Sequence, residues 1–369
     1  MTSLSSELSS AEKEWVMLQP LLLSHGYQLP PRYQPNWKPS WEKRWNFKYK
    51  TECPDFFPLL HHDIMDAVRV KDGVEVAIKH VVLEEDNVPL LQYLNSPEML
   101  KDSRNNAVRL LDVISVPNTS DIFPKPSVLL VMPKLFPLFS FHLPFRHVRE
   151  VLDALQQIME GIVFLHEHRI AHRDACTHNF MMDPTDVIPS GFHLSNNRCQ
   201  PDGVTRIHFR DRCSFPQLRY YLIDFETAEF FPPNSLTIGR YGQVKDVPEM
   251  SETVPYDPFK LDVYQVGSLV KTLIELYEGL DFLVPLRDIM RCPNPELRPT
   301  ASESLSQLHG IVSQLEQTYL SHEIWLKDST PIFPKYQTVS PDEKAKWWKF
   351  GKLAQLICGA NKSTRLNVL

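Results

Sequence analysis

The hydrophobic pattern changes its period along the chain, and this change constrains the fold more than any other feature of the sequence. Residues 64–82 alternate apolar and polar side chains, as a strand does, and Asp72-Gly73 supplies the positive φ angles of a tight hairpin within them. From residue 148 to residue 165, apolar side chains recur every three or four positions, as on one face of a helix. The sequence therefore predicts a sheet-rich first half and a helical second half.

Other segments fit this division. A capping box at Ser9 and Glu12 predicts an N-terminal helix that Gly26 ends, with Pro20 expected to kink or split it. A short helix is predicted at 88–94, followed by an apolar strand at 128–132. Further helices are predicted at residues 257–279, 280–290, 300–319 and 341–358.

Charge and cysteine content argue against several classes of protein. The 369 residues carry a formal net charge of -6, so a basic surface for nucleic acid or anionic membranes has no support in the composition. The six cysteines form no Cys-x-x-Cys pair, which favours reduced thiols over a disulfide framework. The Ser-rich start lacks a signal sequence, and no apolar stretch approaches about 18 residues. We therefore expect a cytoplasmic or nuclear protein.

Proline is abundant and glycine is scarce, at 31 and 12 residues. From Gln28 to Trp45, prolines alternate with aromatic residues that include Tyr33, Trp37 and Trp41. The favoured interpretation is an irregular arm packed on a neighbouring surface, because tryptophan side chains mostly contribute buried area. An aromatic ligand site is the alternative.

Two acidic residues and an amide stand where chemistry could occur. Asp174 and Asn179 fall on one loop after the helical pattern at 148–165, close enough to act on one group. Asp224 directly follows the apolar strand at 220–223, and carboxylates at strand ends are common ligands for Mg²⁺. A loop carboxylate, a loop amide and a strand-end carboxylate together suit phosphoryl transfer.

Several short motifs follow one another in the order found in protein kinases. They are Val76-Ala77-Ile78-Lys79, His172-Arg173-Asp174 with Asn179, Asp224-Phe225, Val247-Pro248-Glu249, Asp262-Val263-Tyr264 and Arg298-Pro299-Thr300. Over roughly residues 60–315, the chain therefore resembles the protein-kinase superfamily. The Trp-rich arm and the run from Tyr220 to Phe225 resemble, more narrowly, the kinase-like proteins of mushroom-forming fungi. The resemblance implies an α+β, two-lobed protein-kinase-like fold with a small antiparallel β N-lobe and a mainly helical C-lobe.

The resemblance also divides the chain into segments. Asp174 and Asp224 are about 50 residues apart, more than is usual in the family, which marks an insert at about 184–218 that could bind a partner. The expected segments are an N-terminal helix and Trp/Pro-rich arm at 1–55, a kinase-like N-lobe at 56–135, a kinase-like C-lobe at 136–320 and a tail at 321–369. Within the insert, a zinc site is not expected, because the spacings match no standard zinc motif for His193, Cys199, His208 and Cys213.

The resemblance further implies how ATP and Mg²⁺ would bind. Lys79 would hold the α- and β-phosphates, while Asn179 and Asp224 would hold Mg²⁺ between phosphates. Ala77 is small enough to leave room for an adenine ring, and the backbone from Pro133 to Leu135 would form the hinge. The residues expected to contact the nucleotide are Ala77, Lys79, Met132, Lys134, Leu135 and Met181.

Other roles follow from the same motifs. Asp174 would orient and deprotonate the acceptor hydroxyl, and Arg173 could pair with a phosphorylated residue between Asp224 and Glu249. Structural roles are expected for the Glu249 and Arg298 ion pair and for Asp262, which would brace the catalytic loop. A lone lysine or aspartate would be an exposed charge or a turn residue, so the ordered set of motifs carries these predictions.

Some positions depart from the family pattern. No glycine occurs from residue 51 to residue 72, so the glycine-rich loop that covers the phosphates is absent. Asn87 stands where a helix would offer a glutamate to Lys79, so this lysine is expected to lack its orienting partner. Cys176 replaces the usual basic residue of the catalytic loop, and Glu226 replaces the glycine after Asp224-Phe225, which adds negative charge near the metal.

Together these features predict a protein kinase-like phosphotransferase that moves the γ-phosphate of ATP to a protein hydroxyl, with Lys79, Asp174 and Asn179 in catalysis. The alternative is a pseudokinase that acts as a nucleotide-binding or protein-binding scaffold. Arg173 and Val247-Pro248-Glu249 argue against a small-molecule phosphotransferase, which typically lacks them. The expected partner is a protein, and neither nucleic acid nor a membrane is expected to bind.

Overall fold

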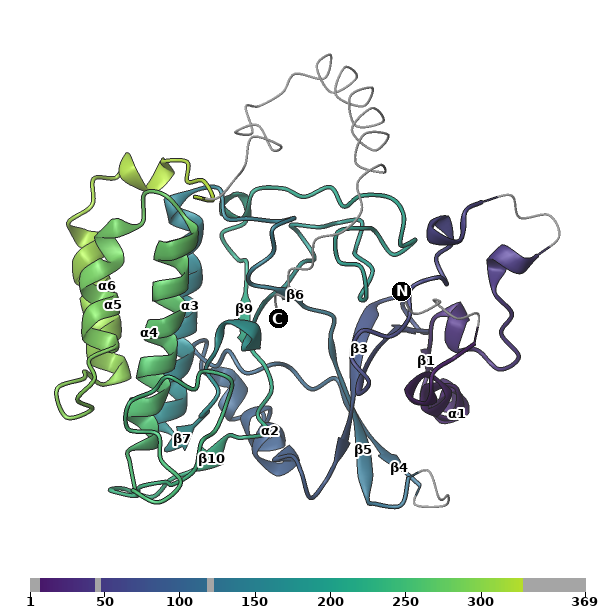
Figure 1. Ribbon diagram of the computed structural model, residues 1–369, viewed down its shortest axis with the longest axis horizontal. Helices are drawn as coiled ribbons and strands as arrows, with labels where there is room; N and C mark the ends of the chain where they lie inside the picture. Colours follow the sequence, from purple (N-terminus) through teal and green to yellow (C-terminus); the bar gives the residue numbers. More distant parts are fainter. Residues whose placement is uncertain (1–6, 44–47, 118–122, 328–369) are drawn as a thin grey trace, which may run out of the picture.

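The computed structural model describes residues 7–43, 48–117 and 123–327. These residues form a mixed α+β structure, in which an antiparallel sheet lies on one side with helix α1 (Ser10–Ser24) and a group of helices lies on the other (Figure 1). The expected division into a sheet-rich first half and a helical second half is confirmed.

The sheet contains five antiparallel strands in the order β1-β2-β3-β5-β4. Their bounds are β1 (Tyr27–Gln28), β2 (Ile64–Arg69), β3 (Glu75–Val82), β4 (Asp112–Val116) and β5 (Ser127–Pro133). Strands β2 and β3 form the predicted hairpin, in which Gly73 adopts a φ of +73°. Their register places Ala77 opposite Asp66 of β2 and Met132 of β5. The predicted short helix follows as α2 (Val88–Leu94).

The N-terminal arm shares the core of this sheet. Helix α1 begins after the predicted capping box at Ser9 and continues past Pro20 to Ser24. Trp15 packs in an apolar cluster with residues of the sheet and donates its indole N–H to the His62 carbonyl at 3.0 Å. Strand β1, which also belongs to the arm, pairs with β2. Helix α1 and the residues up to Tyr33 therefore share the core of the sheet.

A buried ion pair holds the arm to α1. Arg32 and Glu12 approach to 2.7 Å with side chains only 4% and 2% exposed. Burial alone would raise the pKa of Glu12. The hydrogen bonds that Glu12 accepts, of which the one from Arg32 has the largest effect, outweigh burial and lower this pKa. Trp37 is fixed by its indole N–H, which donates to Asp55 Oδ2 at 2.8 Å. Arg32 and Tyr33 are therefore packed in the interior, Trp37 and Trp41 are partly exposed, and Trp45 lies outside the described residues.

The described residues of the helical part form four α-helices and two small sheets. The helices are α3 (Val148–Glu167), α4 (Pro258–Leu276), α5 (Val284–Met290) and α6 (Ala301–Ser313). The strands are β6 (Phe136–Pro137), β8 (Phe180–Met182) and β9 (Tyr220–Leu222) in one sheet, and β7 (Ile170–Ala171) and β10 (Glu229–Phe230) in the other. All four helices confirm predicted ones: α3 extends two residues past the predicted 148–165, and α4, α5 and α6 are shorter than predicted. The helix predicted at 341–358 lies outside the described residues. No helix in the described ranges is both long and apolar enough to cross a bilayer.

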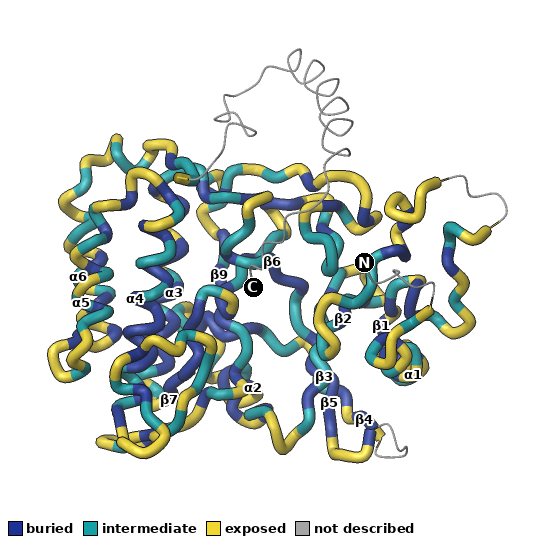
Figure 2. Tube along the Cα trace, viewed as in Figure 1, coloured by how far each residue is buried: buried dark blue, intermediate teal, exposed yellow. Residues whose placement is uncertain are grey.

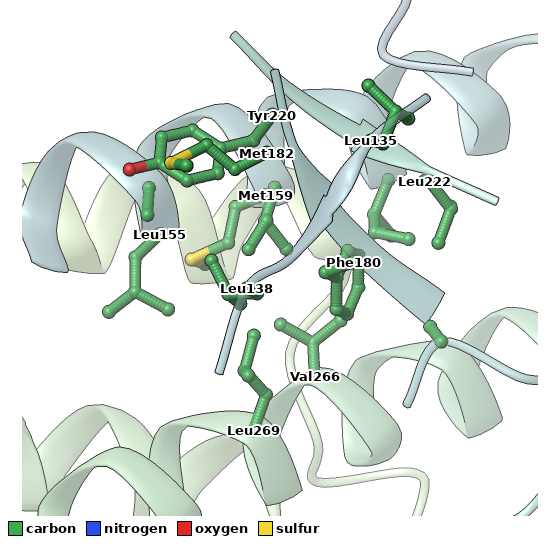
Figure 3. Packing of buried hydrophobic residues seen from close by; sticks show 14 of the residues in the cluster. Leu135, Leu138, Leu155, Met159, Phe180, Met182, Tyr220, Leu222, Val266 and Leu269 are labelled. Atoms are coloured by element: carbon green, nitrogen blue, oxygen red, sulfur yellow. The ribbon is translucent and has the colours of Figure 1, made fainter. Parts of the chain in front are cut away.

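The β6-β8-β9 sheet packs against α3 and α4. Figure 3 shows Phe180 from this sheet close to Val266 of α4, and Leu222 and Met159 of α3 belong to the same apolar cluster. Buried residues line the facing sides of the two helices in Figure 2. Fully burying one such apolar side chain stabilises a fold by about 1.5–3 kcal/mol. This packing therefore fixes the ends of β8 and β9, where polar side chains follow.

The insert at 184–218 is mostly irregular, and its described elements include one short 3-10 turn, η6 (Arg212–Ser214). It contacts both parts of the molecule. Lys134 Nζ, at the end of β5, donates to the Phe192 carbonyl at 2.6 Å. The ring of His193 lies 5.4 Å from the ring of Phe57, in the segment between the arm and β2. The insert thus connects the helical part to the sheet and to the segment that leads into it.

Candidate functional site

Two loops bring the predicted catalytic residues to the ends of paired strands. One loop follows β7 and leads through the turn η5 (Thr177–Asn179) into β8, and the other follows β9. Because β8 and β9 are antiparallel, the start of β8 lies beside the end of β9. The Ile223 N–H accordingly donates to the Asn179 carbonyl at 2.9 Å. Asn179 and Asp224 are therefore neighbours at one edge of the packed sheet.

The Asp174 carboxylate is buried and hydrogen-bonded on both oxygens. Its residue is 6% exposed. Asn179 Nδ2 donates to Asp174 Oδ2 at 3.0 Å and to the Asp174 carbonyl at 2.9 Å. The Gln243 backbone N–H donates to Oδ1 at 2.8 Å, and Gln243 Nε2 lies 3.4 Å from Oδ2. The predicted Asp174 and Asn179 pair is thus one unit, and Gln243 covers it.

Glycine at position 242 permits this close cover. Gly242 has a φ of +71°, in the left-handed region that favours glycine. A Cβ at this position would lie 2.6 Å from Asp174 Oδ1 and 2.6 Å from the Arg173 carbonyl oxygen. A larger residue would therefore push the segment away from Asp174. Nothing in the sequence around Gly242 and Gln243 indicated this contact.

The catalytic loop is braced from α4. Asp262, which is fully buried, accepts the His172 N–H at 2.8 Å and the Arg173 N–H at 2.7 Å. The bracing role predicted for Asp262 is confirmed. Gln265, one turn along the same helix, accepts the Ala175 N–H at 2.8 Å and donates to the Arg173 carbonyl at 2.9 Å. Gln265 is a positioning residue that sequence reasoning missed.

Burial keeps the imidazole of His172 neutral. The ring is fully buried, and its desolvation lowers the pKa of His172. The Asp174 N–H donates to Nδ1 at 3.2 Å, and Nε2 donates to the Ile223 carbonyl at 3.1 Å. A neutral ring with its proton on Nε2 satisfies both contacts. His172 therefore links the loop of Asp174 to the strand end that precedes Asp224.

Lys79 has an acidic partner that the sequence did not reveal. Its ammonium lies 2.9 Å from Asp224 Oδ1, 3.2 Å from Asp86 Oδ2 and 3.9 Å from Glu226 Oε2. Burial alone would lower the pKa of Lys79, but Asp224 and Asp86 outweigh it and raise this pKa above its usual range. The expectation that Lys79 lacks a partner is therefore wrong.

The acidic partner of Lys79 comes from a different position than the one expected. Asn87, expected at the place of the helix glutamate, is the N-cap of α2 and accepts the Leu90 N–H at 3.3 Å. Its Nδ2 donates to the Ala228 carbonyl at 2.9 Å. Asp86 lies one residue before this N-cap, and its side chain, 8% exposed, is turned toward Lys79. Only the path of the chain into α2 brings Asp86 to this ammonium.

The acidic groups around Lys79 favour a cation. Three carboxylates lie within 4 Å of one ammonium, so this cluster carries an excess of negative charge. Burial first, and then the charge of Asp224, raises the pKa of Glu226, as expected for crowded carboxylates. The amide oxygen of Asn179 receives no hydrogen bond from any described residue. Asp224 and Asn179 thus offer the oxygen ligands that Mg²⁺ prefers.

The residues expected around an adenine ring fall into two groups. Ala77, Met132 and Met181 are partly exposed, as a binding surface requires. Lys134 is turned away from solvent, with its side chain 3% exposed and paired with Asp66 at 3.1 Å and Glu75 at 3.3 Å. Leu135, 6% exposed, lies in the core in Figure 3. Lys134 and Leu135 could therefore offer backbone groups to a ligand, in line with a hinge, but not free side chains.

Arg173 already has an acidic partner in this conformation. Its guanidinium lies 2.9 Å from Glu229 Oε2 and donates to the Thr227 carbonyl at 2.6 Å. The ring of Tyr241 lies 4.0 Å from the guanidinium. The predicted pairing with a phosphorylated residue stays a prediction, and Glu229 holds that place in the structure. Arg173 and Asp224 both adopt φ +62°, a left-handed backbone that is uncommon outside glycine and concentrates at functional sites.

Two further expectations concern residues outside the site. The Glu249 and Arg298 ion pair is confirmed at 2.5 Å, with Arg298 side chain fully buried. Two of the four insert residues weighed for zinc have other contacts: Cys199 Sγ donates to the Val204 carbonyl, and Cys213 Sγ lies beside His147.

Comparison of the sequence with protein-family models and with curated proteins found no matching family and no matching protein. Four groups meet in this site. The Lys79 ammonium comes from β3, the Asp224 carboxylate follows the end of β9, and the Asn179 amide and the buried Asp174 carboxylate come from the loop before β8. An arrangement of this kind can hold a divalent cation, neutralise an anionic ligand beside it and accept a proton.

Proposed function

We propose that this protein is a protein kinase-like phosphotransferase that uses ATP and Mg²⁺. One observation carries the proposal: Lys79 pairs with Asp224 at 2.9 Å, while Asn179, which neighbours Asp224 across the strand ends, is hydrogen-bonded to Asp174 at 3.0 Å. Phosphoryl transfer needs a cationic contact to the phosphates, oxygen ligands for Mg²⁺ and a carboxylate that orients the acceptor hydroxyl. These are the groups that the two loops bring together.

Each residue has one role in this proposal. Asp224 and the amide oxygen of Asn179 hold Mg²⁺, which neutralises charge on the transferring phosphate. Lys79 contacts the phosphates as a point charge, and Asp86 keeps it oriented. Asp174 accepts the proton of the substrate hydroxyl. The excess of carboxylates around Lys79 supports the need for Mg²⁺ before a polyanionic nucleotide can bind.

Nucleotide binding is the first test. We expect ATP with Mg²⁺ to raise the melting temperature by about 5 °C near saturation, because ligand at 100 times its Kd stabilises a fold by about 2.7 kcal/mol. ATP without Mg²⁺ should give little shift, since the carboxylates repel it. The variant Asp224→Asn should lose the Mg²⁺-dependent shift, whereas a substitution of the exposed Asp186, Asp186→Asn, should keep it. A wild-type protein without any shift would refute the proposal.

The covering segment predicts a second result. In this conformation Asp174 Oδ1 is occupied by the Gln243 N–H, so transfer requires the segment to move. Gly242→Ala should displace it, because the added Cβ would meet Asp174 and the Arg173 carbonyl at 2.6 Å. We expect basal phosphate transfer to rise about tenfold, since a hydrogen bond to a charged group contributes about 1.5–3 kcal/mol.

The control for this substitution is Gly310→Ala in α6, where an added Cβ meets nothing within 4 Å. It should leave transfer unchanged. If Gly242→Ala instead lowers transfer, the segment supports the active conformation and does not block it. Thermal unfolding of both variants distinguishes a loss of fold from either outcome.

A protein-binding scaffold is the second candidate. It is favoured by the composition of the segment that connects β1 to β2. This segment contains the arm and has no glycine. Within that connection, the Leu59 N–H lies 3.4 Å from Glu12 Oε1, so it is tied to α1 and not free to fold over phosphates. A Mg²⁺-dependent shift with ATP but no phosphate transfer to any protein would favour the scaffold.

A further inference from the structure

Three potential metal ligands meet where the insert contacts the start of α3. His147 is the N-cap residue of α3, Glu150 lies in its first turn, and Cys213 lies in the turn η6 of the insert. Cys213 Sγ is 3.6 Å from His147 Nδ1, which is 3.6 Å from Glu150 Oε1. All three ligand atoms lie within 4.8 Å of one another. This cluster shares no residue with the Lys79 and Asp224 site and plays no part in the proposed transfer.

The spacing of these atoms suits tetrahedral zinc. Zinc binds sulfur at about 2.3 Å and nitrogen or oxygen at about 2.0–2.1 Å. Tetrahedral angles then place sulfur and nitrogen about 3.5 Å apart and nitrogen and oxygen about 3.3 Å apart. The observed 3.6 Å separations differ from these values by only a few tenths of an ångström. A thiolate, an imidazole and a carboxylate are also the ligand types that favour zinc over Mg²⁺ or Ca²⁺.

The ligands are held in place by the surrounding backbone. Glu150, 1% exposed, accepts the Arg146 N–H at 2.8 Å on Oε2 and the Cys213 N–H at 3.2 Å on Oε1. Hydrogen bonds of this kind orient metal-binding carboxylates. The side chain of His147 is 22% exposed, and Cys213 is also partly exposed, so an ion can reach the cluster from solvent. The site is therefore organised on one side and accessible on the other.

We propose that His147, Glu150 and Cys213 bind one zinc ion, with water as the fourth ligand, and that this ion fastens the insert to α3. Binding exchanges the S–H bond for a Zn–S bond and releases one proton to solvent. No oxidant or reductant is required.

Zinc binding to the full-length, untagged protein tests this proposal. The protein is stripped with a chelator, dialysed against zinc chloride and analysed for bound metal, and Co²⁺ is added to a second sample as a spectroscopic substitute. We expect one equivalent of zinc, a thiolate-to-cobalt charge-transfer band, and a rise of about 5 °C in melting temperature with zinc. The near-isosteric Cys213→Ser should weaken zinc binding at least tenfold and abolish the band.

Two comparisons keep the result decisive. Cys292→Ser, which changes a half-buried thiol outside the insert, should bind zinc as the wild type does. His147→Gln should also weaken zinc binding, and its thiolate-to-cobalt band should be weaker than that of the wild type. In the presence of chelator, wild type and Cys213→Ser should unfold at similar temperatures, which shows that the variant is folded. Equal zinc binding by wild type and Cys213→Ser, or no zinc retained by the wild type, would overturn the proposal.

Discussion

Asp174→Asn is expected to reduce phosphate transfer by about a hundredfold to ten-thousandfold while ATP and Mg²⁺ still raise the melting temperature. A positioned general base contributes about 10²–10⁴ to a rate, and an amide cannot accept the proton. Asp174 is the buried carboxylate that Asn179 holds at 3.0 Å. The proposed Mg²⁺ ligands, Asp224 and Asn179, remain in this variant, so nucleotide binding should persist.

The measurement is transfer of labelled γ-phosphate to a mixture of protein substrates, compared with thermal unfolding under the same conditions. Asp186→Asn serves as the matched control, because Asp186 is exposed and lies outside the site. Transfer that survives Asp174→Asn at the wild-type rate would rule out Asp174 as the base. A variant that also loses the Mg²⁺-dependent shift would indicate that Asp174 supports the metal site and not only the acceptor.

The sequence predicted those features that depend on local pattern. Helical and strand periods predicted β2, β3, β5 and the helices α3 to α6, because a buried face must repeat with the period of its own element. The loop of Asp174 and Asn179 could be found for a related reason: both residues lie on one short segment, and the following strands fix their direction. Bracing by Asp262 followed from the same set of ordered motifs.

The features that were missed depend on contacts between distant segments. Asp86 reaches Lys79 because the chain turns before α2, and no periodicity records that turn. Gln243 meets Asp174 across 69 positions of sequence, through a loop without regular structure. Cys213 reaches His147 across 66 positions by way of the insert. Such contacts follow from tertiary packing, so residue type and spacing along the sequence did not predict them.

The Glu249 and Arg298 pair gives the largest expected effect on stability. Arg298 is fully buried, and its guanidinium binds Glu249 at 2.5 and 3.0 Å and the Lys260 carbonyl at 2.6 Å. Two further donor contacts reach the Cys292 carbonyl. Removing one partner of a buried pair leaves an uncompensated charge and typically costs about 3–5 kcal/mol. Arg298→Met should therefore lower the free energy of unfolding by about this amount in urea titrations.

The origin of this loss can be separated with a second substitution. Most of the cost of Arg298→Met should come from the charge of Glu249, whose side chain is 8% exposed. Adding Glu249→Gln to Arg298→Met should then recover part of the stability, because the buried charge is gone. The surface pair of Arg287 and Asp288 supplies the control, and Arg287→Met should cost at most about 1 kcal/mol. If Arg298→Met costs no more than that control, or if the double variant is less stable than Arg298→Met alone, the unpaired charge is not what destabilises the fold.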